Sequence, residues 1–280
     1  MANYYYLIAG LPDISFDGSK APVTVESFRS EVYEALSGSD RKVMDLLLLE
    51  NDCRNLVTLL GSGSVPADAP RGLLGTDRME EVIAQVKAQD KPDQDIPGFI
   101  YTFIEEWQNE SWRGMAGFAE DRLWSLFYDY AMESDNGFVR EWYRFNLNVN
   151  NIQAAITART YGLDMQKVIV GSDDIAHALR TSGARDWGLS QELEYFEDVA
   201  RLQEEDDLSQ RERKTDMLRW RWLEDNSFFN YFSVEKLFSY MVRLGMVERW
   251  TGMDRERGQQ LFRELIGSLK DQTEVPAEFK

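Results

Sequence analysis

The side chains that most often perform catalysis or bind metals are scarce in this sequence of 280 residues, which holds one His and one Cys. A lone Cys53 cannot form an internal disulfide, and a lone His177 cannot supply the several histidines of most zinc or di-iron centres. His177 has no second ligand nearby, so we interpret it as a helix-surface side chain. Cys53 lies in an apolar and acidic stretch that disfavours a thiolate, and we interpret it as a buried structural thiol.

The motifs of common catalytic and nucleotide-binding sites are also missing. The sequence has no Gly-x-x-x-x-Gly-Lys-Ser/Thr loop, no Gly-x-Ser-x-Gly, no Cys-x-x-Cys and no His-Glu-x-x-His. The run from Gly61 begins like a dinucleotide fingerprint, but Pro66 stands where the third Gly belongs. Neighbouring carboxylates such as Glu80 and Glu81 point to different sides of a helix. We therefore expect no cofactor, no metal and no catalytic role, although distant carboxylates could still meet in a pocket.

The net negative charge of the chain argues against binding to nucleic acid or to anionic lipid. The chain has 49 acidic and 31 basic side chains, a formal net charge of −18. Such a surface repels phosphate backbones and anionic lipid, so we expect no nucleic-acid partner. We find no apolar run of about 18 residues, no signal-peptide pattern and only one Cys. The sequence therefore predicts a cytoplasmic protein that reaches a membrane only through partners.

Long stretches without Pro or Gly carry helical periodicity, which predicts an all-α fold. The clearest helix begins after Gly137, places apolar residues at spacings of three and four, and stops at Gly162. A further helix is expected to begin with Thr76 as its N-cap. Two short segments, Tyr4 to Ala9 and Val168 to Val170, are β-branched or aromatic and are expected to be extended.

Loops are predicted where Gly, Pro, Ser and Asp gather, at 61–75 and 90–97. The acidic run Glu204 to Asp207 fits either a charged linker or the solvated side of a helix. We expect three helical units, at 1–97, 98–171 and 172–280, which could also form one continuous domain.

One polar pattern occurs twice in the two longest helical stretches. Asp52 and Asn55 correspond to Asn148 and Asn151, each pair three residues apart on one helix face. An apolar residue follows each pair directly, Leu56 in the first stretch and Ile152 in the second. Asp and Asn are unfavourable inside helices because their side chains compete for backbone hydrogen bonds. The repetition favours a shared structural role over chance similarity.

Arg and Trp side chains cluster at residues 219–222, shortly after the basic residues Arg211, Arg213 and Lys214. Two interpretations remain open for this cluster. It is either a core seam flanked by arginines or a binding interface, since Trp and Arg often dominate binding energy. The residues of the candidate interface are Arg219, Trp220, Arg221 and Trp222.

Several of these segments resemble a bacterial family encoded within V-type (V/A-type) ATP synthase operons, where it takes the place of the C-type subunit, the homologue of the eukaryotic d-type subunit. The resemblance covers most of the chain. The C-type subunit is built from repeated helical units in which an acidic or amide residue precedes an Asn-Leu or Asn-Ile pair, as Asp52/Asn55-Leu56 and Asn148/Asn151-Ile152 do here. A third such element is missing around 233–250. The segments that carry the resemblance are 3–13, 48–56, 98–104 and 141–152.

The resemblance implies an elongated or funnel-shaped, all-helical connector without catalytic residues. It would lie on the cytoplasmic side of the proteolipid ring and receive the foot of the rotor stalk, built from D- and F-type subunits. It would thus be peripheral to the inner membrane through the ATP synthase. Two alternatives remain: an assembly factor or helical scaffold for the same complex, and a stand-alone helical enzyme that uses a carboxylate pair.

Overall fold

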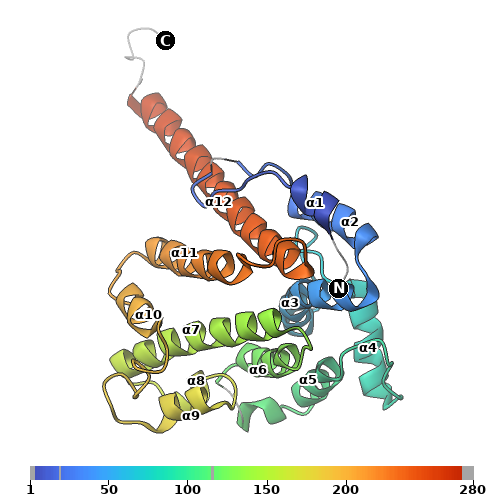
Figure 1. Ribbon diagram of the computed structural model, residues 1–280. Helices are drawn as coiled ribbons and strands as arrows, with labels where there is room; N and C mark the ends of the chain where they lie inside the picture. The colour runs from blue at the N-terminus through green and yellow to red at the C-terminus, as the bar shows by residue number, and fades with distance from the viewer. Residues whose placement is uncertain (1–3, 19, 115–116, 273–280) are drawn as a thin grey trace, which may run out of the picture. The chain divides into compact units, whose positions relative to one another are not determined.

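The computed structural model describes the main chain of residues 4–18, 20–114 and 117–272, and the side chains as far as Met253. Within these ranges every regular element is a helix, so the predicted all-α, multi-helix fold is confirmed (Figure 1). No described helix is long and apolar enough to span a membrane. The elements are α1 (Tyr5–Ala9), α2 (Val25–Ala35), α3 (Gly38–Ser62), α4 (Thr76–Ala88), α5 (Gly98–Gln108), a 3₁₀ turn η1 (Ser111–Gly114), α6 (Ala119–Met132), α7 (Gly137–Tyr161), α8 (Met165–Val168), α9 (Asp174–Thr181), α10 (Phe196–Leu202), α11 (Leu208–Ser227) and α12 (Val234–Gln272).

The chain divides into two compact units. The smaller unit joins residues 1–36 to 230–280, and the larger unit is continuous over Ser37–Phe229. The boundaries expected near residues 97 and 171 both fall inside the larger unit. The division into three helical units, at 1–97, 98–171 and 172–280, stays a prediction.

The smaller unit is built around the first half of α12, against which α2 packs. The Val25 amide at the start of α2 donates to Glu248 Oε1 on α12 at 3.0 Å. Further along, the ring of Phe28 lies 4.9 Å from that of Tyr240. These contacts bury the apolar side of α2, which contains Phe28 and Val32.

The prediction of an extended segment at Tyr4 to Ala9 is wrong, because residues 5–9 form the short helix α1. The Tyr4 amide donates to the Phe232 carbonyl at 3.0 Å, and its ring is buried. The main chain of this segment therefore pairs within its own short helix and, at Tyr4, with one loop carbonyl. Aromatic content alone does not make a strand.

Two helices of 25 residues each, α3 and α7, dominate the larger unit. Each ends at a glycine in the left-handed conformation, Gly63 at φ 79° and Gly162 at φ 68°, where a Cβ would be strained. Helix α7 begins at Gly137 and stops before Gly162, which agrees with the prediction within a residue. Helix α6 packs against both long helices, and its Phe127 is fully buried beside Tyr143 of α7, with ring centroids 5.3 Å apart.

Three local predictions are settled by the larger unit. Thr76 is the first residue of α4, and the cap before it is Gly75 at φ 78° without a side-chain hydrogen bond, so the predicted Thr76 cap is wrong. The predicted strand at Val168 to Val170 is also wrong, since α8 ends at Val168 and Val170 pairs with a side chain. Residues 204–207 connect α10 to α11, which supports the charged-linker interpretation.

Candidate functional site

The polar pair on α3 attaches the following loop to the helix. Asp52 is 2% exposed and accepts hydrogen bonds from the amides of Leu73 at 2.7 Å and Leu74 at 3.1 Å. One turn further, Asn55 Nδ2 donates to the Pro70 carbonyl at 2.9 Å. We call Asp52, Asn55 and main chain 70–74 the α3 anchor. Its loop approaches so closely that a Cβ on Gly72 would lie 1.9 Å from Asp52 Oδ1.

The second long helix attaches its following loop in a similar way. Asn151 is 1% exposed, and its Nδ2 donates to the Val170 carbonyl at 2.7 Å while its Oδ1 accepts from the Val170 amide at 2.9 Å. We call Asn151 and Val170 the α7 anchor. The next residue, Gly171, has φ 82°, and a Cβ there would approach Leu147 to 3.2 Å.

The first members of the two polar pairs differ in their partners. Asp52 binds main-chain amides, whereas Asn148 Nδ2 donates to the Tyr195 hydroxyl at 2.9 Å. Asn148 Oδ1 is buried and has no hydrogen-bond partner among the described residues. The closest correspondence is therefore between Asn55 and Asn151, each of which donates to a loop carbonyl.

The apolar residues of the repeated pattern lie in the core. Leu56 is 2% and Ile152 is 0% exposed. Each long helix thus buries an amide directly beside an aliphatic side chain, and the loop peptide satisfies the amide that this packing removes from water.

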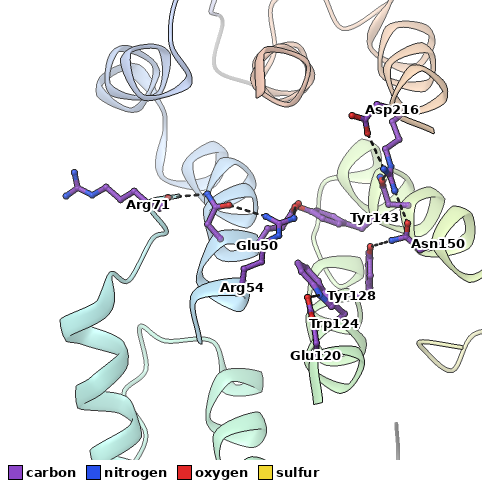
Figure 2. A network of polar contacts seen from close by, with 12 residues as sticks. Glu50, Arg54, Arg71, Glu120, Trp124, Tyr128, Tyr143, Asn150 and Asp216 are labelled. Atoms are coloured by element: carbon purple, nitrogen blue, oxygen red, sulfur yellow. Dashed lines mark hydrogen bonds and ion pairs between the residues drawn. The ribbon is translucent and has the colours of Figure 1, made fainter. Parts of the chain in front are cut away.

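A second group of polar side chains joins four helices of the larger unit (Figure 2). We call it the polar cluster. The Tyr143 hydroxyl of α7 donates to Glu50 Oε1 of α3 at 3.0 Å, and Asn150 Nδ2 of α7 donates to the Tyr128 hydroxyl of α6 at 3.2 Å. Its members are Glu50 and Arg54 on α3, Tyr128 on α6, Tyr143, Asn146 and Asn150 on α7, and Asp216 and Arg219 on α11.

Arg219 attaches α11 to α7 within this cluster. Its Nε donates to Asn146 Oδ1 at 2.9 Å and one terminal nitrogen donates to Asn150 Oδ1 at 2.8 Å. The other terminal nitrogen lies 3.3 Å from Asp216 Oδ1 on its own helix. Asp216 is 2% exposed, so the guanidinium also supplies a countercharge to a buried carboxylate.

Burial shifts the pKa values of several groups in the cluster. Loss of hydration raises the pKa of Glu50 above its ordinary value, against the opposing effects of Arg54, Tyr143 and Arg219. Loss of hydration also raises the pKa of Tyr128 to about 12, and it raises the pKa of Tyr143 well above its ordinary value. Both phenols therefore stay protonated near neutral pH and act as hydrogen-bond donors or acceptors, not as bases.

The four residues of the candidate interface occupy different environments. Trp220 is 4% exposed, and the ring of Trp222 stacks on Phe145 of α7 with centroids 5.4 Å apart. Arg219 belongs to the polar cluster, while the side chain of Arg221 is exposed. Three of the four thus contribute to helix packing, and Arg221 alone is open to a partner.

The remaining candidates for chemistry are separated from one another. His177 lies on the exposed side of α9, and Cys53 is buried in α3, where loss of hydration and Asp52 raise the pKa of its thiol well above the ordinary value. Within the described part of the chain, no three His, Cys, Asp or Glu residues are grouped to hold a metal ion.

Sequence reasoning missed Glu50, Tyr143 and Gly72. Glu50 lies two residues before Asp52, the start of the first polar pattern, which is the one sequence signal that could have found it. Its partner Tyr143 is 93 residues away, and Gly72 looks like any other loop glycine until the path of the loop is known.

Together, the fold and the anchors define an all-helical protein in which buried polar side chains hold loops on long helices. The chain belongs to the family described as "Protein of unknown function (DUF2764)", which matches residues 1–273. No curated protein and no solved structure matches it.

Proposed function

We propose that this protein is a non-catalytic connector in the central stalk of a V/A-type ATP synthase. In this proposal it couples the rotor stalk, made of D- and F-type subunits, to the membrane proteolipid ring. The observation that carries the proposal is the pair of 25-residue helices, α3 and α7, each with a buried amide that holds the loop after it. These amides, Asn55 and Asn151, belong to the segments that resemble the C-type subunit.

The distribution of charge supports a binding role. The larger unit has 21 basic and 36 acidic residues, which gives −15 of the total charge of −18. A surface of this kind favours a basic partner and would set the orientation and rate of docking. A stalk foot with a basic surface would be such a partner.

The pairing of the buried polar groups also supports a structural role. The groups of the two anchors and of the polar cluster pair with one another and with main chain, as groups that stabilise helix packing do.

The decisive experiment is a measurement of stoichiometry. Native membranes are solubilised in mild detergent, the ATP synthase is purified through another subunit, and this chain is quantified by mass spectrometry against D- and F-type subunits. The same purification from a strain that lacks the gene for this chain serves as the control. We expect one copy per rotor in the intact, coupled enzyme.

The alternative, an assembly factor, predicts a different result. An assembly factor would be present on incomplete complexes and absent from the finished enzyme. If a complete and coupled enzyme lacks this chain, the connector proposal is wrong. If the chain is absent from both kinds of complex, the association with the ATP synthase is wrong as well.

A further inference from the structure

Glu50 is a partly buried carboxylate whose main donor is neutral. Its Oε1 accepts a hydrogen bond from the Tyr143 hydroxyl at 3.0 Å. The nearest cation, Arg54, has a nitrogen 3.7 Å from Glu50 Oε2, which is too long for a good hydrogen bond. Arg54 also donates to Asn51 Oδ1 at 3.2 Å, and its guanidinium lies 5.4 Å from the ring centroid of Trp124. Arg54 is therefore shared among three partners.

The second nearby cation is engaged elsewhere. The described donors of Arg219 go to Asn146, Asn150 and Asp216, so its guanidinium attracts Glu50 only from a distance. The titratable and charged groups that interact with Glu50 are thus Cys53 and Arg54 from its own helix, Tyr128 from α6, Tyr143 from α7 and Arg219 from α11. Only Arg54 forms an ion pair with Glu50 among the described contacts, and that pair is long, at 3.7 Å.

Another glutamate of the larger unit shows the opposite arrangement. Glu106 on α5 is 9% exposed, and its two carboxylate oxygens accept from Nε and a terminal nitrogen of Arg122, both at 2.8 Å. This two-point pair compensates a buried carboxylate charge well. Glu50, whose side chain is 25% exposed, is largely removed from water without such a pair.

We propose that Glu50 is a proton-binding group, and that its protonation tightens the polar cluster that joins α3, α6, α7 and α11. The proton comes from bulk water and binds one carboxylate oxygen. The Tyr143 hydroxyl keeps its acceptor, because the neutral acid retains a carbonyl oxygen that accepts hydrogen bonds. The inference does not depend on the proposed function.

The direction of the pH effect follows from linkage. Burial raises the pKa of Glu50 above 4.5, so the folded protein binds this proton more tightly than the unfolded chain does. The contribution of Glu50 to stability is fully present below its unfolded pKa and is lost as pH rises through the folded pKa. The cluster is thus most stable with Glu50 protonated, and the charged form weakens it.

The test compares Glu50→Gln with the control Glu106→Gln in the full chain, by urea unfolding across pH 4 to 8. Glutamine keeps the shape of a protonated glutamate. We expect Glu50→Gln to match the wild type at the acid end and to be more stable than the wild type toward neutral pH. The gain in the folding equilibrium constant is about threefold where the folded pKa exceeds the unfolded pKa by about 0.5. Hydrogen exchange of α7 amides should slow by the same factor. Glu106→Gln should destabilise the protein at neutral pH, because it leaves the Arg122 guanidinium without its countercharge.

A second measurement follows the proton directly. Carboxyl ¹³C NMR of Glu-labelled protein should show one resonance that titrates above the ordinary range of Glu and is missing in Glu50→Gln. Tyr143→Phe removes the hydroxyl that lowers this pKa, so the same resonance should titrate at still higher pH. The proposal is overturned if the resonance titrates at or below the ordinary value, or if Glu50→Gln loses as much stability as Glu106→Gln at neutral pH.

Discussion

The side-chain amide of Asn151 pairs with both polar atoms of the Val170 peptide, at 2.7 Å from the carbonyl oxygen and 2.9 Å from the nitrogen. A side chain of α7 thus satisfies both the amide and the carbonyl of Val170, as the main chain of a neighbouring strand would. This contact explains why a segment with strand-like composition satisfies its main chain without a neighbouring strand.

Asn151→Ala is expected to lower the free energy of unfolding by about 2–3 kcal/mol, since two buried hydrogen bonds are lost and a peptide group is left unsatisfied. Urea unfolding measures the change. The control Asn226→Ala, on the exposed side of α11, should change stability by less than about 0.5 kcal/mol. Unchanged melting of Asn151→Ala together with lost binding to the ATP synthase would assign Asn151 to an interface instead.

Gly72→Ala should destabilise the protein by about 1–3 kcal/mol, because the new Cβ would collide with the Asp52 carboxylate and displace the α3 anchor. Gly61→Ala is the matched control. Gly61 lies inside α3 with no atom near the position of a Cβ, and alanine there should stabilise by up to about 1 kcal/mol. Equal melting temperatures for the two variants would show that the loop does not approach Asp52 closely.

Arg219→Met should cost about 2 kcal/mol or more, since Asn146, Asn150 and the buried Asp216 each lose a donor. Arg221→Met removes an exposed cation two positions away and should leave stability within about 0.5 kcal/mol. Thermal unfolding distinguishes the two. If Arg221→Met instead weakens binding to the purified ATP synthase, the interface interpretation of residues 219–222 gains support at that residue.

The native protein should react very slowly with a thiol reagent such as DTNB. Burial raises the pKa of the Cys53 thiol, so little thiolate forms near neutral pH and the reagent has no access to it. Reaction in denaturing urea provides the full signal for comparison. Rapid labelling of one thiol in native buffer would contradict the burial of Cys53.

Binding to the isolated rotor stalk should weaken as salt rises. The charge of −15 on the larger unit predicts that the association rate falls roughly tenfold between low and physiological ionic strength, with little change in dissociation. Stopped-flow or surface-based kinetics at several salt concentrations measures both rates. A rate that does not depend on salt would remove the electrostatic part of the proposed function.

Periodicity and a helix-stop signal were sufficient to predict helix α7, because its apolar spacing and the glycine at 162 agree on where the helix runs and where it ends. The same local logic failed at Tyr4 to Ala9, where three consecutive tyrosines suggested a strand. The path of the chain there depends on the distant Phe232 carbonyl.

The polar residues of the candidate site could be predicted from the sequence, but their partners could not. The unfavourable placement of Asp52, Asn55, Asn148 and Asn151 inside helices pointed to a structural role. The anchors supply one for three of them, whereas Asn148 binds the Tyr195 hydroxyl. The partners of these residues, and the contact between Glu50 and Tyr143, depend on how helices pack, which residue spacing does not encode.

The two anchors bind loops through main-chain atoms: carbonyls of Pro70 and Val170 and amides of Leu73, Leu74 and Val170. Every residue has such a carbonyl, and every residue except proline has such an amide. The side-chain identity of most loop positions is therefore free to drift, and insertions between Gly63 and Pro70 would leave the attachment in place. Most loop positions should accordingly tolerate substitution. The helix amides that bind these loops, Asn55 and Asn151, should tolerate almost none.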